Sequence, residues 1–353
     1  MEWGSSRTDS HEYYRVSFPE FAELERLSCF GDGGTIDQSQ FTALRVSASL
    51  PVTNYPFIDN DLVRIYAVVT DEAGNTHREA LATLIPTYPA QDITAQGDTG
   101  TITLYSVLYL ASVRKTLAPY VIPAGTSAIS HAAYLLTQCG VPVIADASAA
   151  ALAVDKVYDP LTTYLDIIND LCDFAGFGAV TVDGMGNALL KQYVNPNTQA
   201  PAVVMTSGDG CVFAPVVSHE LDTFSIPNRY TVVSSPAEGA SLSVTAINDD
   251  PGSIVSTVSR GYYVDAGETV SDIADATALA ALALRRLADA TSAVESIEIS
   301  HVWLPFDLGD VVLVDYEHAG ERWQFTACTR SITLGRGTMC KTRLRRFVTC
   351  QID

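Results

Sequence analysis

Short β-like runs broken by turn residues fill most of this chain, and a helical region interrupts them in the middle. Four runs follow one another from Thr35 to about Arg114: "FTALRVSASL", "LVRIYAVVT", "EALATLIPTYPAQ" and "GTITLYSVLYLAS". The sequence "DEAGN" at 71–75 joins the second run to the third and has the composition of a hairpin turn. We therefore expect a small antiparallel β-barrel domain at 35–118, preceded by a partly ordered N-terminal arm at 1–34.

The pattern becomes helical after a stretch rich in proline and glycine. The segment "SAISHAAYLLTQCG" at 127–140 has apolar residues at helical spacing, a possible cap at Thr126 or Ser127, and a terminal glycine. A second helix is predicted within "DPLTTYLDIINDLCDFAGFG" at 159–178. Its apolar stripe consists of Leu161, Leu165, Ile168, Leu171 and Cys172. These features predict an inserted α/β domain at 119–210.

β character then returns, with "NRYTVVSS", "SLSVTAIND", "SIEISHVWL", "DVVLVDYE", "RWQFTACTRSIT" and "CKTRLRRFVT". One helix, predicted at 270–290 after a possible Ser271 cap, interrupts these runs. We expect a second β-barrel domain with one helix at 211–353. The predicted fold class is therefore α+β and β-rich, with two small antiparallel β-barrel domains and an inserted α/β domain. The length of 353 residues fits several cores, because one core rarely grows beyond roughly 250 to 300 residues.

Charge argues against nucleic acid as a specific partner. The chain has 21 basic and 41 acidic residues and a net charge of -20, so its surface repels phosphate backbones and anionic lipid. No run approaches 18 apolar residues, and the N-terminus lacks a basic stretch followed by an apolar one, so we expect neither a membrane-spanning segment nor a secretion signal. The seven cysteines are spread widely, as expected for structural thiols: Cys29, Cys139, Cys172, Cys211, Cys328, Cys340 and Cys350.

Motifs that carry catalysis or bind metals are missing from the sequence. It contains no G-x-S-x-G, no P-loop and no H-E-x-x-H. The six histidines lie far apart: His11, His77, His131, His219, His301 and His318. The carboxylate pairs Asp59 with Asp61 and Asp249 with Asp250 stand beside turn residues, where Asp accepts backbone N–H bonds. We therefore assign no catalytic, cofactor-binding or metal-binding residue and expect no enzyme and no cofactor.

One local positive cluster lies near the C-terminus. It consists of Lys341, Arg343, Arg345 and Arg346. In a strand, Arg343 and Arg345 face one side and Arg346 the other, so the cluster is not a continuous basic stripe. We expect it to pair with acidic neighbours or a partner subunit.

The segment "FGAVTVDGMGNALL" at 177–190 could hold a metal or a phosphate, or it could reverse a hairpin. A calcium loop needs oxygen ligands at alternate positions and a late Glu, but after Asp183 only Asn187 follows. A phosphate loop would open a helix with its glycines, whereas Gly184 and Gly186 stand between two β-like runs. These four residues are therefore predicted to form a hairpin turn.

Three passages, in their order and spacing, resemble the baseplate-hub or tail-tip-hub proteins of tailed bacteriophages and related injection machines. The first is "VIPAGTSAISHAAYLLTQCGV" at 121–141, where such hubs leave the first barrel. The second is "YDPLTTYLDIINDLCDFAGFGAVTVDGMGNALL" at 158–190, a helix under a hairpin with Asp-x-x-Gly at its tip. The third is "HVWLPFDLGDVVLVDY" at 301–316, where a Leu-Gly-Asp turn leads into a strand of the second barrel. The likeness covers roughly residues 55 to 348.

This resemblance implies a structural hub of the tail tip or baseplate, located in the virion at the distal end of the tail and made in the host cytoplasm. A homotrimer would form a ring between the sixfold tail tube and threefold distal components. The implied partners are a tail-tube or distal tail protein, the tape-measure protein, and a tail fibre or spike. The implied ring also lets DNA pass, and an acidic lumen would not retain a polyanion.

Two alternatives come from other functional classes. A carbohydrate-binding or host-adhesion module of the tail tip would use exposed aromatic rings as platforms for sugars. An acidic-site hydrolase would need two carboxylates across a cleft. Four aromatic residues are candidates for interface anchors, with core packing equally open for each: Tyr55, Phe57, Tyr316 and Trp323.

Overall fold

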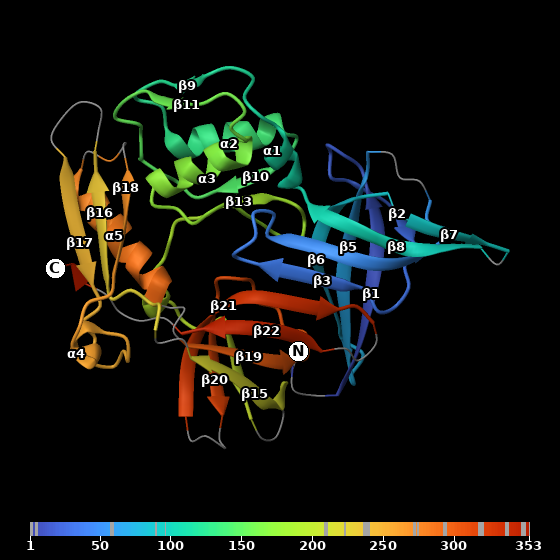
Figure 1. Ribbon diagram of the computed structural model, residues 1–353. Coiled ribbons are helices and arrows are strands. Elements are labelled where there is room, and N and C mark those ends of the chain that lie inside the picture. The colour runs from blue at the N-terminus through green and yellow to red at the C-terminus, as the bar shows by residue number, and fades with distance from the viewer. Residues whose placement is uncertain are drawn as a thin grey trace.

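The computed structural model has three parts: a large β-sheet, an inserted domain of helices and short strands, and a lobe in which one helix packs on a four-stranded sheet (Figure 1). The inserted domain lies beside both of the other parts. The structure describes all residues except 1–2, 4–5, 57–59, 89, 96, 208–210, 222–223, 236–240, 271–272, 274, 292–294, 317–320, 336–338, 347–350 and 353.

The large sheet contains fourteen strands drawn from both ends of the chain. Its strands are β1 (Arg7–Val16), β2 (Glu23–Leu27), β3 (Thr35–Ser39), β4 (Val46–Thr53), β5 (Leu62–Asp71), β6 (Thr76–Pro86), β7 (Ala90–Thr94), β8 (Gly97–Ser106), β14 (Val203–Thr206), β15 (Phe213–Leu221), β19 (Glu295–His301), β20 (Val311–Tyr316), β21 (Glu321–Thr333) and β22 (Cys340–Arg345). The hydrogen-bonded path runs β15-β19-β22-β21-β3-β4-β8-β6-β5-β1-β2, with β7 beside β8, β20 beside β21 and β14 beside β20. Most of its pairs are antiparallel, whereas β14 and β20 are parallel.

Two closed barrels are not confirmed, because one pairing joins the two expected barrels into an open sheet. Strand β3 uses one edge for β4 and the other for β21, where Asp37 lies opposite Ser331 and Ile36 opposite Ile332. The apolar core follows the same continuity, since Ile332 and Cys340 pack in the cluster that contains Ile36. The edge strand of each half, β3 or β21, is therefore paired with the edge strand of the other half.

The expectation of an N-terminal arm is wrong for residues 7–16. These residues form β1, which pairs with β5 from Arg7 opposite Asp71 to Val16 opposite Leu62. The misreading has a physical cause. Most β1 side chains are half-exposed, and the sequence of the strand is therefore largely polar. Its backbone hydrogen bonds to neighbouring strands nevertheless hold it inside the sheet.

The inserted domain has its own apolar core beneath two helices that were predicted. Its elements are α1 (Tyr109–Val113), β9 (Tyr120–Ile122), α2 (Ala128–Gln138), β10 (Val143–Ala145), β11 (Lys156–Tyr158), α3 (Tyr164–Phe174), β12 (Thr181–Val182) and β13 (Ala188–Leu190), followed by the short helix η1 (Pro196–Thr198). The side chain of Ser127 caps α2 and that of Thr163 caps α3. Leu161, expected in the apolar stripe of the second helix, lies outside α3 and is 65% exposed. The stripe therefore begins at Leu165.

The strands at 229–247 do not join the large sheet, contrary to the expected second barrel. A separate sheet is formed by β16 (Arg229–Ser234), β17 (Leu242–Ile247), β18 (Asp265–Val270) and β23 (Gln351–Ile352) in the order β18-β16-β17-β23. The helix α5 (Ala276–Thr291) packs on this sheet through Leu279, Leu282 and Leu287, and the short helix α4 (Thr257–Arg260) lies at one end. Ser271 is outside the described residues, and the Asp275 side chain accepts the N–H of Ala278 instead.

His301 is fully buried in β19, so we expect it to make folding depend on pH. Burial lowers the pKa of this imidazole from 6.5 to about 4. Between these values the unfolded chain binds a proton that the folded chain does not, so stability falls as the pH drops from 6.5 towards 4, by about 2 to 3 kcal/mol in total. Urea unfolding of the His301→Gln variant at pH 7 and pH 5 should show a smaller difference between the two pH values than the wild type does. His77→Gln, at a half-exposed histidine, serves as the control, and an equal difference in wild type and His301→Gln contradicts the prediction.

Candidate functional site: polar clamps on the inserted domain

The tip of the β12–β13 hairpin is a turn, as expected. Asp183 accepts hydrogen bonds from the backbone and side-chain nitrogens of Asn187, both at 2.8 Å, and Gly186 takes a left-handed φ of 89°. The "DEAGN" turn between β5 and β6 has the same design, with Asp71 bonded to Asn75. The carboxylate at the tip of the hairpin therefore serves the turn.

Gly184 is explained by docking of the hairpin. The equivalent position in the "DEAGN" turn is Glu72, so the turn itself does not require glycine there. A Cβ at Gly184 would lie 1.8 Å from the carbonyl oxygen of Ala80 in β6. The hairpin tip thus rests directly on the large sheet, at a distance that excludes any side chain.

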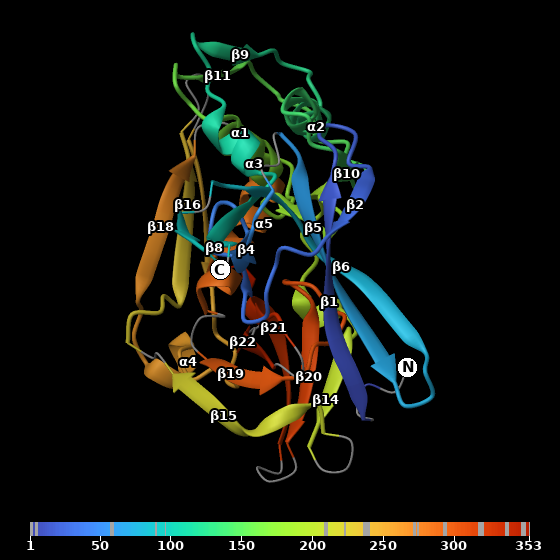
Figure 2. The same cartoon turned by 90° about the vertical axis from the view of Figure 1, so that its right-hand side faces the viewer.

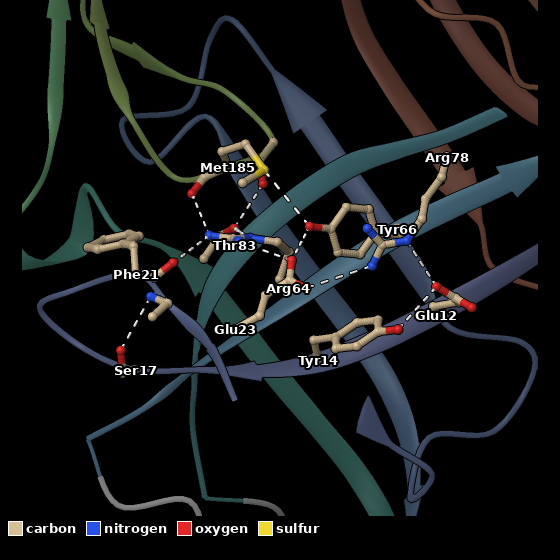
Figure 3. Close-up of polar contacts among 12 residues, drawn as sticks. Glu12, Tyr14, Ser17, Phe21, Glu23, Arg64, Tyr66, Arg78, Thr83 and Met185 are labelled. Carbon is tan, nitrogen blue, oxygen red and sulfur yellow. Dashed lines mark hydrogen bonds and ion pairs between the residues drawn. The ribbon is translucent and has the colours of Figure 1, made fainter. Parts of the chain in front are cut away.

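The buried guanidinium of Arg64 fastens this tip to the sheet (Figure 3). Arg64 is 2% exposed; its Nε donates to Thr83 Oγ1 at 2.8 Å and its Nη2 to the carbonyl oxygen of Met185 at 3.0 Å. Thr83 in turn donates to the carbonyl oxygen of Gly184 at 2.8 Å. The Nη1 atom of Arg64 lies 3.2 Å from the carboxylate of Glu23, which supplies the negative counter-charge. We call this group the Arg64 clamp.

A second layer of side chains orients Glu23 of the Arg64 clamp. The Tyr66 hydroxyl donates to Glu23, and the guanidinium of Arg78 lies 3.4 Å from the centre of the Tyr66 ring (Figure 3). Partial burial opposes ionisation of Glu23, but the hydrogen bonds from Tyr66 and Arg64 outweigh it and lower the pKa of Glu23. The carboxylate therefore stays charged beside Arg64.

A second clamp joins the inserted domain to the four-stranded lobe. Asp173, at the end of α3, accepts hydrogen bonds from Arg285 and, at 2.7 Å, from Arg286, both on α5. Arg285 also donates to the carbonyl oxygen of Phe177 at 2.9 Å, and Arg286 donates to Glu268 of β18 at 2.7 Å. We call this group the Asp173 clamp. Each oxygen of the Asp173 carboxylate accepts from a different arginine, which fixes the orientation of the carboxylate as well as its distance.

The two clamps link the three parts of the chain to one another. Apolar packing supports them, because the core of the inserted domain includes Val16, Leu62, Val107 and Leu108 from the large sheet and its connection. Buried ion pairs add little net stability once desolvation is counted, so the clamps chiefly specify the docking geometry.

The predicted aromatic anchors are partly packed into the molecule. The Tyr55 ring lies 5.9 Å from Phe30, that of Tyr316 lies 6.0 Å from Phe213, and Trp323 packs against the core of the second half of the sheet. Phe57 lies outside the described residues. The three described rings therefore favour core packing over a docking role.

The basic cluster and the carboxylate pairs do not assemble into a site. Lys341 pairs with Glu298 at 2.5 Å, in agreement with the expected acidic neighbours, and Arg343 bonds to Ser296. Asp250 accepts the N–H of Gly252 in a turn, whereas Asp59 lies outside the described residues. Within the described chain, no three His, Cys, Asp or Glu side chains form a group that could hold a metal ion. No described helix is long and apolar enough to cross a membrane.

Neither clamp was predicted from the sequence, although the positions of Arg64 and Gly184 in the sequence indicate buried contacts. Arg64 is the one charge in the apolar run "LVRIYAVV", and a charge in a buried strand needs partners. Gly184 occupies a turn position at which the "DEAGN" turn has Glu72, so the turn itself does not require a glycine there. Nothing in the sequence near Asp173 indicates Arg285 or Arg286, which lie more than a hundred residues away.

Replacing Gly184 with alanine should loosen the inserted domain. The new Cβ would collide with the Ala80 carbonyl, and we expect a loss of about 1 to 3 kcal/mol in the free energy of unfolding. Gly178→Ala is the matched control, since a Cβ there meets only the Lys191 carbonyl oxygen at 4.0 Å. Urea unfolding of both variants tests the docking, and equal stabilities contradict it.

Arg64→Lys should weaken the same contact, although the charge is kept. The compact ammonium group of lysine cannot bond Thr83, Met185 and Glu23 at once as the planar guanidinium does. We therefore expect the free energy of unfolding to fall by about 2 kcal/mol. Arg26→Lys, at a side chain that is 61% exposed, is the control. Limited proteolysis should cut the hairpin region faster in the Arg64 variant alone. Identical cleavage rates in the two variants speak against the clamp.

Comparison with known proteins reveals likeness in fold alone. No family model matches the sequence, and no curated protein matches it significantly. The tail protein from Neisseria meningitidis MC58 is similar in structure, with a TM-score of 0.72 and 13% identity over 96% of this chain and 97% of that one. The prophage MuSo2 43 kDa tail protein from Shewanella oneidensis gives a TM-score of 0.60 and 13% identity over 95% and 98%.

The likeness extends to a second prophage protein and to an injection complex. The prophage tail protein gp18 from Listeria monocytogenes EGD-e has a TM-score of 0.57 and 15% identity over 95% of this chain and 94% of that one. A chain of the lidded Francisella PdpA-VgrG complex has a TM-score of 0.54 and 7% identity, over 97% of this chain and 53% of that one. The resemblance to tail-hub proteins of phages and phage-like injection machines, predicted from the sequence, is thus confirmed at the level of the fold.

Proposed function

We propose that this protein is a non-catalytic structural hub at the distal end of a phage tail or of a phage-like particle. One observation carries the proposal: nearly the whole chain shares its fold with nearly the whole of three phage or bacterial tail proteins. Such full-length likeness differs from a single shared domain, because all three parts of the molecule and their order take part. The clamps agree with a role in which the molecule must hold a fixed shape.

In this role three copies form a ring that joins the sixfold tail tube to threefold distal components. The ring contacts a tail-tube or distal tail protein on one side and a fibre or spike on the other, with the tape-measure protein and DNA passing through it. A net charge of -20 suits such a passage, because acidic walls repel DNA and do not retain it. Closed rings of identical subunits need large and lasting interfaces.

The mass of the purified chain in solution tests this assembly. Light scattering across a range of concentrations should give three times the monomer mass of 37.8 kDa. High salt should favour the trimer, because it screens repulsion between acidic copies. A monomer at every concentration contradicts the proposed ring, and a monomer that also binds cell-wall glycans supports the adhesion alternative.

A further inference from the structure

A small cavity lies where the two halves of the large sheet meet at the beginning of β1. Figure 2 shows β1 reaching down to the strands of the C-terminal half of the sheet. The wall of the cavity is built from β1 and β5 of the first half, and from β21, β22 and the segment after β19 of the second half. Six of the lining residues are Asp9, Ala67, Val69, Trp303, Ile332 and Cys340.

The size of the cavity limits what it can hold. Its volume is about 10 Å³, which is the space that a single water molecule needs. Its apolar wall belongs to the core of the sheet, since Ala67, Val69, Ile332 and Cys340 are each at most 3% exposed. Any molecule larger than water would have to displace these packed side chains.

Two polar side chains in the wall have buried atoms without a hydrogen-bond partner in the described part of the chain. One atom is the indole Nε1 of Trp303, a donor, and the other is the Oδ1 of Asp9, an acceptor. The Oδ1 atom lies 3.1 Å from the Nε of Arg7, but the two form an ion pair without the alignment of a hydrogen bond. Buried polar atoms of native proteins are nearly always bonded, to the protein or to an ordered water.

Arg7 holds these two side chains close to each other. Its Nη2 donates to the carbonyl oxygen of Trp303 at 2.8 Å and to the Oδ2 of Asp9 at 3.3 Å. Asp9 is also fixed by its place opposite Val69 in the β1–β5 pair, and the Trp303 ring packs 5.7 Å from that of Trp3. A donor from the second half of the sheet and an acceptor from the first half are therefore held at the same cavity.

The chemistry of the wall selects water over ions of similar size. A metal cation or an ammonium ion cannot accept the N–H of Trp303. An anion such as chloride has no proton to donate to the Oδ1 of Asp9. A water molecule does both, because its oxygen accepts one hydrogen bond while one of its protons makes another.

We infer that this cavity binds one structural water, which accepts from Trp303 Nε1 and donates to Asp9 Oδ1. The water links β1 in the first half of the sheet to the segment after β19 in the second half. It thereby supplements the direct pairing of β3 with β21. The inference is independent of the proposed function, because it concerns how the two halves of the sheet are joined.

The test measures magnetisation transfer from water to the indole N–H of Trp303 in the ¹⁵N-labelled full chain. The resonance is identified by its loss in Trp303→Phe. A bound water gives a rotating-frame cross-peak of opposite sign to one from chemical exchange, and we expect this sign in the wild type. Val69→Ile adds a methylene group to the wall and should abolish the cross-peak by displacing the water. Val63→Ile, at a fully buried valine of the same strand, is the matched control and should retain it.

A cross-peak that Val63→Ile keeps and Val69→Ile loses supports the water site. A wild type without the cross-peak overturns the inference, and so does a cross-peak that persists in Val69→Ile, because its source would then lie outside the cavity. A crystal structure of the wild type decides the matter even if Val69→Ile fails to fold. It should show a water within about 3.2 Å of both Trp303 Nε1 and Asp9 Oδ1. Density that is missing, or that contacts one of the two atoms alone, contradicts the assignment.

Discussion

The close approach of the hairpin tip to β6 is the contact on which the arrangement of the molecule depends. Gly184 lies against the Ala80 carbonyl with no room for a side chain, and the Arg64 guanidinium bonds both to the tip and to the strand beneath it. A Cβ at Gly184 would overlap the Ala80 carbonyl oxygen, so the hairpin tip approaches β6 more closely than any side chain would allow. The opposite side of that domain is then fixed by Asp173 and its two arginines.

Geometry rather than stability explains why polar groups were used at these junctions. Removing a guanidinium and a carboxylate from water costs several kcal/mol, which their mutual attraction repays only with complete hydrogen bonding. In the proposed hub, which would contact neighbours of different symmetry, the Arg64 clamp and the Asp173 clamp would favour one docking angle.

Local features of the fold could be predicted from the sequence, whereas distant pairings could not. The helices α2 and α3 and both Asp-x-x-Gly-Asn turns follow from caps, glycines and apolar spacing within a few residues. The junction of β3 with β21 joins residues almost three hundred positions apart, and no local pattern encodes it. Leu161 was misassigned because an exposed leucine at helical spacing looks like a core residue. Of the candidate site, Asp183 could be given its role as a turn residue, and the Arg64 clamp could not.

The central proposal is that this acidic molecule is a ring-forming component at the end of a tail. An image of the intact particle by electron cryomicroscopy, at a resolution that places domains, tests that claim most directly. The account predicts three copies around the tail axis at its distal end, with a channel along the axis. Single copies attached to the outside of the tail, or no copies in the particle, would contradict it.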